Sequence, residues 1–447
     1  MFDASRTKPQ NRGMTLAGFL IAGPVAHSHA LWRNPDHAVP FLSLQYYVDI
    51  ARVLERGKFD LIFFADRLAI ADRFGSDKKI GIGRGDQDST RLDPVPILGA
   101  LAAATTNIGL GATRSTTYEQ PYHIAREFQT LDHLSGGRAA WNVVTSMNDG
   151  EALNFGLESH LNHDQRYDRA DEFMEVIHKL WDSWERDALI LDRASGIYAD
   201  AAKVHYVNHA GPYFKSRGPL NIPPGPQGRP VIIQAGASDR GRAFAVKWAE
   251  VIFNISPTRD HMRRVTLGVR EENARLGRPD GASKSLTAIM PFVGRTREEA
   301  EEKRDQANAL VDPMVGLSTL SAHANFDLGV LDLDAPVAQL QSTGTQSLIA
   351  MASRIARDES LSLREIGRRY GQSVLVPQLC GTARHIADEL ADIFLSGTAD
   401  GFVLSPAFLP DSFAEFVDFV VPELQRMKVF RSDYRATTLR GNLQSGL

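Results

Sequence analysis

Eight short apolar runs, nearly all followed by an amphipathic helix, constrain this sequence more than any other feature. Several of these runs read as strands that are covered on both faces. The predicted strands are Thr15–Ile21, Phe59–Ala65, Ile108–Ala112, Arg138–Val144, Pro230–Ala235, Glu250–Asn254, Leu286–Val293 and Asp400–Ser405. Regular alternation of strands with helices favours a parallel sheet. The number of strands predicts a closed (β/α)8 TIM barrel, with a doubly wound open sheet as the alternative.

The helices are marked by apolar residues at helical spacing and by recognisable ends. Ser43 is a predicted N-cap and Gly57 a stop, and Pro121 and Gly136-Gly137 bound a later helix. Further helices are predicted at about 94–106, 165–184, 239–248, 258–276, 296–310 and 411–427. Two stretches do not fit the alternation, 185–229 and 311–380, and we expect insertions or lid segments at the barrel mouth. Residues 1–447 are otherwise expected to form a single domain.

Composition narrows the classes of partner. The formal net charge is −4, which gives no general attraction for nucleic acid or an anionic membrane. Cys380 is the single cysteine, which excludes an internal disulfide and indicates a reducing compartment such as the cytoplasm. Basic residues before Thr15–Ala22 imitate a secretory signal, but a first buried strand is the simpler interpretation. No apolar stretch reaches the ~20 residues that span a bilayer.

Polar side chains stand where the predicted strands end. Asp66 ends the second strand, Thr113 ends the third, and Asn142 and Ser146 lie within and just after the fourth. In a barrel of this kind the chemistry lies at the carboxyl ends of the strands, so these side chains are expected on one rim. An asparagine inside an apolar strand, with hydroxyls at its end, indicates a core strand that becomes binding surface.

A turn of small residues follows the fifth predicted strand. Gly236, Ala237 and Ser238 stand between that strand and a helix that begins near Asp239. Small residues let backbone N–H groups approach an anion, and the helix N-terminus adds about half a positive charge. The turn therefore suits a phosphate. A tight strand-to-helix turn with a Ser/Asp N-cap explains the same residues about as well.

Other motifs in the sequence do not indicate a dinucleotide site, a metal site or a pair of catalytic carboxylates. GIGRGD at 81–86 lacks the third glycine and the preceding strand of a dinucleotide fingerprint. His160, His163 and Asp164 lie close together without a third ligand cluster, so solvated or N-capping roles are expected and no metal is predicted. A hydrolase with paired carboxylates needs two acids at strand ends, and only Asp66 stands out in that position.

Several sequence blocks occur in an order that is typical of one enzyme family. The blocks are ALWRNPD (30–36), ERGKFDLIFFAD (55–66), STTYEQPYHIAREFQTLDHLSGGR (115–138), SGGRAAWNVVTS (135–146), RYDRADEF (166–173), GPLNIPPGPQGRPVIIQAG (218–236), ADGFVLSPAFLP (399–410) and FVDFVVPELQR (416–426). Together they resemble a flavin-dependent branch of the bacterial luciferase superfamily. That branch includes the nitrilotriacetate, pristinamycin, dibenzothiophene-sulfone and long-chain alkane monooxygenases. The match is weakest at about 311–360.

The resemblance implies a barrel that binds reduced FMN (FMNH2) delivered by a separate NAD(P)H:flavin reductase. It implies addition of O2 at the flavin C4a position, after which the (hydro)peroxide oxygenates a small organic substrate, often breaking a C–N or C–S bond. A homodimer or homotetramer is the family expectation. The same superfamily contains deazaflavin (F420)-dependent oxidoreductases, which remain an alternative. A flavin-binding protein without turnover is a third possibility.

The resemblance also assigns roles to residues of this chain. Carried over by position, it places Asp66, Thr113 and Asn142 beside the isoalloxazine ring or the ribityl chain, and Tyr167, Gly236, Ala237 and Ser238 at the phosphate. Family members have a histidine shortly before the WRxP motif, near the reactive face of the flavin.

Catalytic roles are less sharply assigned. Both His27 and His29 precede Trp32, and the sequence does not decide between them; Ser146 is a further candidate. Arg67 and Arg114 follow rim positions and could attract an anionic substrate. Met147 stands where alkane-oxidising relatives have a histidine, which weakens a long-chain alkane as substrate.

Overall fold

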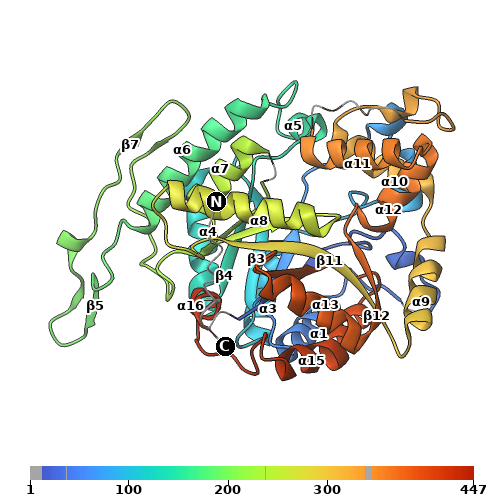
Figure 1. The fold of residues 1–447 in the computed structure, drawn as a ribbon. Coiled ribbons are helices and arrows are strands. Elements are labelled where there is room, and N and C mark those ends of the chain that lie inside the picture. Colours follow the sequence, from blue (N-terminus) through green and yellow to red (C-terminus); the bar gives the residue numbers. More distant parts are fainter. Residues whose placement is uncertain are drawn as a thin grey trace, which may run out of the picture.

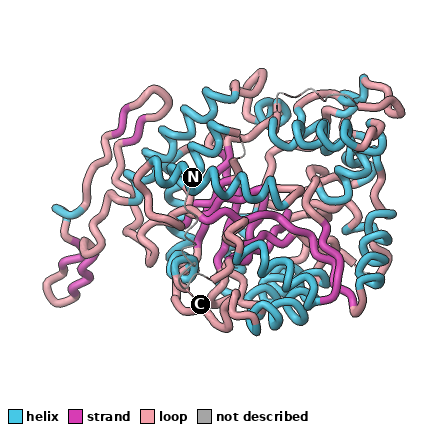
Figure 2. Tube along the Cα trace, viewed as in Figure 1, coloured by secondary structure: helices cyan, strands magenta, loops and turns pink. Residues whose placement is uncertain are grey.

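The computed structural model describes residues 13–36, 38–236, 238–337, 340, 342 and 344–446. Eight parallel strands form a closed ring in its centre (Figures 1 and 2). In ring order they are β1 (Thr15–Ile21), β2 (Leu61–Ala65), β3 (Gly109–Ser115), β4 (Ala139–Val144), β9 (Val231–Gln234), β10 (Val251–Asn254), β11 (Lys284–Gly294) and β13 (Gly401–Leu404). β13 pairs with β1 and with β11, and β10 pairs with β11, so no edge is left in the ring. The predicted (β/α)8 barrel is confirmed, and the open sheet is wrong.

Side chains of the ring strands alternate between two apolar layers. Phe19, Phe63 and Phe253 belong to the cluster that fills the ring, and their rings contact one another. Leu20 and Phe64 point the other way and join the larger cluster under the helices. Burial on both faces explains why these strands are continuous apolar runs in the sequence.

Helices surround the ring (Figure 2) and follow the predicted ranges closely, apart from α13, which was not predicted. They are α1 (Leu44–Arg56), α3 (Pro94–Ala104), α4 (Pro121–Leu134), α6 (His163–Trp181), α7 (Asp239–Trp248), α8 (Arg259–Arg275), α9 (Arg297–Ala309) and α13 (Ala383–Leu395). Ser43 occupies the N-cap position of α1 without a side-chain capping bond. The helix predicted at 411–427 is divided into α14 (Asp411–Glu415), a π-helical turn at Phe416–Val420 and α15 (Val421–Arg426).

Residues 185–229 contain two small antiparallel sheets. β5 (Leu189–Asp192) pairs with β6 (Ile197–Ala199), and β7 (His209–Ala210) pairs with β8 (Lys215–Ser216). Figure 1 shows these strands on a projection that reaches away from the barrel at the left. We call residues 185–217 the arm.

Residues 311–380 form a helical unit with an apolar cluster of its own. It consists of α10 (Pro313–Ala324), α11 (Gln346–Asp358) and α12 (Leu363–Ser373). The unit ends in β12 (Gln378–Thr382), which pairs with the Met290–Gly294 end of β11 outside the ring. Sequence analysis missed β12, because the run is short and only half-buried and shows no apolar periodicity.

Short elements complete the described fold. They are α2 (Lys79–Arg84), α5 (Asp149–Asn154) and α16 (Leu439–Gln444). In the described ranges, no helix has both the length and the apolar character that crossing a bilayer requires.

Candidate functional site

The ends of β3 and β4 present a buried amide at the barrel mouth. Thr113 lies directly opposite Asn142 in the register of the two strands. Asn142 Nδ2 donates to Thr113 Oγ1 at 2.9 Å, and Thr113 Oγ1 donates to Phe64 O at 2.8 Å. Asn142 Oδ1 is buried and has no hydrogen-bond partner. Because an unpaired buried acceptor costs about 1–3 kcal/mol, this oxygen marks a place for a ligand that donates a hydrogen bond.

Ser146 follows β4 in a left-handed backbone conformation, with φ of 57°. Its Oγ lies 2.9 Å from Ser115 Oγ and 3.2 Å from Glu151 Oε1. Arg166 of α6 donates to the Ser146 carbonyl oxygen, which helps to hold the backbone at Ser146 in place. A small cavity is lined by residues that include Asp66, Thr113 and Ser146. The structure thus brings three of the predicted site residues together.

Asp66 lies between that small cavity and a second, larger one. Its Oδ1 accepts from the Arg67 N–H at 2.9 Å, and its Oδ2 lies 3.8 Å from Arg114 Nη1. The second cavity has a volume of about 600 Å³ and reaches from this rim to α4, where Glu127 lines it. Burial raises the pKa of Asp66 to about 6, although nearby arginines oppose the shift. The carboxyl group therefore takes up a proton close to neutral pH.

A cradle of polar groups surrounds the N-terminus of α7. Ser238 caps the helix, and its Oγ accepts from the Gly241 N–H at 3.0 Å. A Cβ at Gly241 would lie 2.6 Å from the Tyr167 hydroxyl oxygen and 3.0 Å from Ser238 Oγ, so a larger residue here would displace the Tyr167 hydroxyl. His163 Nε2 lies 3.3 Å from Ser238 Oγ. A Cβ at Gly236 would lie 2.4 Å from the Gly241 carbonyl oxygen.

His27 and His29 occupy different surroundings. The His27 ring stacks on Phe19, with 3.9 Å between centroids, and its Nδ1 lies 2.7 Å from Ser405 Oγ at the end of β13. His27 therefore lies over the filled interior of the ring, at its mouth. His29 instead contacts the helical unit, where its Nε2 lies 3.2 Å from Thr319 Oγ1 of α10.

Both imidazoles are neutral at pH 7. Burial, together with the smaller effects of the nearby His29 and Arg91, lowers the pKa of His27 to about 3. Burial lowers the pKa of His29 to about 4, against the attraction of Asp88. A neutral imidazole keeps one nitrogen as an acceptor and the other as a donor.

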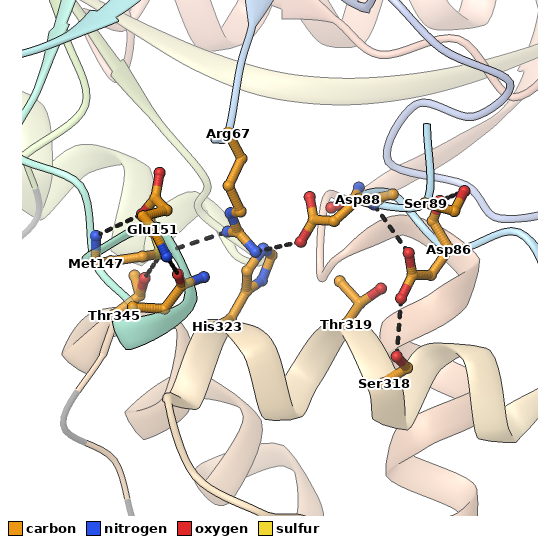
Figure 3. A network of polar contacts seen from close by, with 12 residues as sticks. Arg67, Asp86, Asp88, Ser89, Met147, Glu151, Ser318, Thr319, His323 and Thr345 are labelled. Atoms are coloured by element: carbon orange, nitrogen blue, oxygen red, sulfur yellow. Dashed lines mark hydrogen bonds and ion pairs between the residues drawn. The ribbon is translucent and has the colours of Figure 1, made fainter. Parts of the chain in front are cut away.

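A buried ion-pair network joins the rim to the helical unit (Figure 3). Arg67 Nη1 lies 2.5 Å from Asp88 Oδ2, and Arg91 Nη2 lies 2.6 Å from Asp88 Oδ1. The side chains of Arg67 and Asp88 are only 7% and 1% exposed. Beside them, Asp86 accepts from the Ser318 hydroxyl of α10 at 2.8 Å.

Arg114, like Arg67, forms ion pairs with carboxylates of the protein. Its Nη2 lies 2.7 Å from Asp93 Oδ1, and its Nε lies 3.1 Å from Glu127 Oε2. The hypothesis that Arg67 and Arg114 attract an anionic substrate is therefore not supported, because carboxylates of the protein already neutralise both guanidinium groups.

The comparisons with known proteins identify the family. Residues 25–400 match the family of luciferase-like monooxygenases. The chain belongs to this family. It is 51% identical over 439 residues to the dibenzothiophene-sulfone monooxygenase of Rhodococcus erythropolis, an alignment that covers 97% of each chain. It is 40% identical to nitrilotriacetate monooxygenase component A of Aminobacter aminovorans, which covers 97% of this chain and 96% of that one.

A solved structure of a related protein has the same fold. A riboflavin lyase, determined with modified FMN and riboflavin, superposes with a TM-score of 0.90 at 35% identity, over 97% of this chain and 96% of that chain. Relatives at 40–51% identity are named monooxygenases, so this luciferase-like chain is a monooxygenase. The interpretation as a protein without turnover is therefore wrong.

In this luciferase-like monooxygenase the predicted site residues other than His27 and His29 form two groups. Asp66, Thr113, Asn142 and Ser146 meet at the ends of β2–β4, and Tyr167, Gly236 and Ser238 meet at the start of α7. Ala237 lies outside the described residues.

Sequence analysis missed one side chain in the second group. His163 was assigned a solvated or capping role, whereas Asn162 caps α6 and His163 reaches Ser238. The available signal was its spacing: His163 and Tyr167 are four residues apart and share one helix face. Within the described residues, no cluster of three or more His, Cys, Asp or Glu side chains has the arrangement of a metal site.

Proposed function

We propose that this luciferase-like monooxygenase is the oxygenase component of a two-component system. It takes FMNH2 from a separate NAD(P)H:flavin reductase and uses O2 to oxygenate a small organic substrate, with cleavage of a C–S or C–N bond. The observation that carries the proposal is the cluster of Tyr167, Ser238 and His163 at the N-terminus of α7, on the rim that also holds the unpaired Asn142 Oδ1.

These groups fit the two ends of an FMN molecule. A phosphate dianion suits a helix N-terminus flanked by two hydroxyls and an imidazole, because all of them can donate hydrogen bonds to it. Asn142 Oδ1 suits a ring N–H or a ribityl hydroxyl, either of which would satisfy this buried acceptor. The riboflavin lyase structure, which contains modified FMN, supports a flavin in the same fold.

Bound reduced FMN supplies two electrons that activate O2, so that one oxygen atom enters the substrate and the other leaves as water. The chain's own residues create the conditions for that step. Phe19 belongs to the apolar cluster inside the ring beneath His27, and the helical unit packs against the rim through the Asp86–Ser318 contact. Neutral His27, held by Ser405 at Nδ1, can hydrogen-bond to a bound group through its other ring nitrogen without carrying a charge.

The charge balance of the rim supports a neutral organosulfur substrate over a polyanionic aminocarboxylate. Arg67 and Arg114 are both paired with carboxylates of the protein, so neither offers an unmatched positive charge to a substrate. The relative from Rhodococcus erythropolis, which is named for a sulfone, agrees with this preference.

An anaerobic fluorescence titration of the purified chain with FMN, before and after chemical reduction, tests the cofactor. We expect reduced FMN to bind more tightly than oxidised FMN, and riboflavin, which lacks the phosphate, to bind more weakly than FMN. A turnover assay then adds a flavin reductase, NADH and either dibenzothiophene sulfone or nitrilotriacetate. We expect product from the sulfone.

Other outcomes would redirect the proposal. Binding of deazaflavin F420 in place of FMN would establish the alternative oxidoreductase. Faster turnover of nitrilotriacetate than of the sulfone would contradict the neutral substrate but leave the cofactor assignment standing.

A further inference from the structure

Asp66 is the carboxyl group that two cavities at the rim of the barrel have in common. Both cavities are lined by Asp66, Leu68 and Arg114. The larger one, of about 600 Å³, extends outward to α4. The Asp93 side chain at its edge is 56% exposed, so this cavity is open to bulk water. The smaller one lies on the inner side, under the rim, and the Asp66 carboxyl therefore stands between solvent and the barrel mouth.

The smaller cavity is polar and has room for about one water molecule. It offers about 10 Å³ to the centre of a water, which is close to what one water needs. Its polar lining includes Asp66, Thr113, Ser115, Ser146 and Glu151. Ser115 Oγ and Ser146 Oγ are 2.9 Å apart, and Thr113 Oγ1 accepts from Asn142 Nδ2. A hydroxyl group or a water can accept one proton and donate another, so these groups connect Asp66 with the mouth.

The proposed reaction requires protons to move inside this site. FMNH2, O2 and the substrate give FMN, the oxygenated substrate and water, so atoms and electrons balance without a net proton. The two hydrogens, however, leave nitrogen atoms of the flavin ring and end on the oxygen atom that becomes water. A group that takes up and releases a proton close to the mouth speeds this transfer.

The two imidazoles near the mouth are not suited to this task. Burial lowers the pKa of His27 to about 3 and the pKa of His29 to about 4. Both rings therefore stay neutral at pH 7, whereas a proton carrier works best when its pKa is close to the working pH. Asp66 meets this condition, because burial raises its pKa to about 6.

The guanidinium group that lies beside Asp66 is held by other carboxylates. Arg114 Nη1 comes only within 3.8 Å of Asp66 Oδ2, which is too far for a hydrogen bond. Arg114 instead forms ion pairs with Asp93 at 2.7 Å and with Glu127 at 3.1 Å. Its attraction for the Asp66 carboxylate is weakened in this way, and burial decides the direction in which the pKa of Asp66 moves.

The remaining charged groups around Asp66 come from three other segments. Arg67 and Arg91 both form ion pairs with Asp88, as Figure 3 shows for Arg67. The other titratable side chains that line the larger cavity are Glu119 and His123. The arginines near Asp66 are thus matched by other carboxylates, which leaves the Asp66 carboxyl free to exchange a proton with water.

We propose that Asp66 transfers protons between solvent in the larger cavity and the reacting oxygen at the barrel mouth, through water in the smaller cavity. This inference rests on the proposed monooxygenase function. Asp66 acts through water and hydroxyl groups, so its role is proton transfer rather than contact with the reacting atoms.

The protonation of Asp66 can be measured in the flavin-free chain. Carbon-13 NMR of the chain labelled at its aspartate carboxyl groups should show a signal that titrates near pH 6 and is missing from Asp66→Asn. Burial also raises the pKa of Asp86 to about 6, and the variant distinguishes the two signals. If no titrating signal near pH 6 disappears in Asp66→Asn, the inference is wrong.

Rapid mixing of the chain loaded with reduced FMN with O2 tests the transfer itself. Without an organic substrate both oxygen atoms leave as hydrogen peroxide, so the result does not depend on the identity of the substrate. In the wild type, the rate at which bound oxidised flavin reappears should fall as pH rises through about 6, because protonated Asp66 is the donor. Asp66→Asn should be about 100-fold slower at pH 6 and should lack this pH dependence.

The matched control is Glu119→Gln, which removes a carboxyl group that lines only the larger cavity. It should keep both the wild-type rate and its pH dependence. Asp66→Ala separates proton transfer from a structural role, because its shorter side chain leaves room for a small buffer molecule. Imidazole, which carries a proton near neutral pH, should restore the rate of this variant in proportion to its concentration.

The outcomes distinguish this inference from the proposed function. Asp66→Asn with the wild-type rate and pH dependence would overturn the inference and leave the proposed function standing. Slow variants that imidazole does not restore would also overturn it, because Asp66 would then have only a structural or binding role. A wild-type chain that does not bind reduced FMN would contradict the proposed function and, with it, the inference.

The wild type decides if neither Asp66 variant folds. A rate of flavin oxidation that is constant between about pH 5 and about pH 8 refutes the inference. A rate that falls through about pH 6, in step with the titration of an aspartate signal, supports it.

Discussion

Only one of the two polar atoms of the Asn142 side chain has a hydrogen-bond partner at the barrel mouth. Its Nδ2 is fixed by Thr113, while its Oδ1 is buried without a partner. The side chain is thus oriented before any ligand arrives, and the flavin-binding proposal requires only that a donor complete the remaining contact. The polar groups at the start of α7 are also oriented beforehand, because the hydroxyls of Tyr167 and Ser238 both lie close to Gly241.

Replacing Gly241 with alanine tests the cradle. The added Cβ would displace the Tyr167 hydroxyl, and we expect FMN to bind about tenfold more weakly, a loss of about 1.4 kcal/mol. Riboflavin binding should change little, because riboflavin has no phosphate. Gly268→Ala in α8 is the control: its Cβ meets nothing closer than 3.5 Å, so FMN affinity should be unchanged and stability slightly increased. Equal losses for FMN and riboflavin would argue against a phosphate at this position.

Replacing His29 with glutamine tests the burial of a neutral imidazole. The unfolded chain protonates His29 near its ordinary pKa of 6.5, whereas burial lowers the pKa in the folded chain to about 4. The stability due to neutral His29 is therefore present above pH 6.5 and is lost as pH falls toward 4. From pH 7 to pH 5, we expect the wild type to lose about 2 kcal/mol relative to His29→Gln in urea unfolding. A difference that stays constant with pH would contradict this burial.

Residue types at strand ends could be predicted from the sequence, but side-chain directions could not. Thr113 and Asn142 follow from strand periodicity, since alternate residues of neighbouring strands face the same layer. His27 and His29 lie in a loop with no period, so only their contacts in the fold, such as the stacking of His27 on Phe19, distinguish them. Arg67 and Arg114 looked free because their carboxylate partners come from other loops and helices.

At the scale of elements, the strands and helices of the barrel were predictable because each has an apolar pattern of its own. β12 was not, since its position beside β11 depends on pairing rather than on composition. The break between α14 and α15 was missed for a similar reason. Apolar residues continue through the π-helical turn Phe416–Val420 with helix-like spacing.

Asp88→Asn tests how the helical unit is attached to the barrel. Burial favours the neutral acid, yet the charges of Arg67 and Arg91 outweigh it and lower the pKa of Asp88. Removing its charge leaves two guanidinium groups short of a partner, which costs about 3–5 kcal/mol in buried pairs. We expect a lower urea midpoint, with amide exchange in α10 increasing before exchange in the barrel strands.

The matched control for Asp88→Asn is Asp77→Asn, whose ion pair with Lys79 is exposed. It should leave the urea midpoint unchanged. An Asp88→Asn protein as stable as the wild type would show that the network does not hold α10 in place.

At the scale of the whole molecule, the number and alternation of strands were enough to predict a closed ring. They did not give the arrangement of residues 185–229 and 311–380, whose packing has no sequence period to reveal it. The helical unit is placed by contacts such as Asp86–Ser318, and the arm by Glu172 at its root. Such contacts join residues that are distant in the chain, and single-sequence patterns do not encode them.

The place of β13 between β1 and β11 has a consequence for synthesis on the ribosome. The first strand of the ring must wait for residues 401–404 before it gains its second neighbour. Until then the nascent chain holds an incomplete sheet with two unpaired borders, at β1 and β11. During this interval both borders are open to other chains, so chaperone protection matters most just before translation ends.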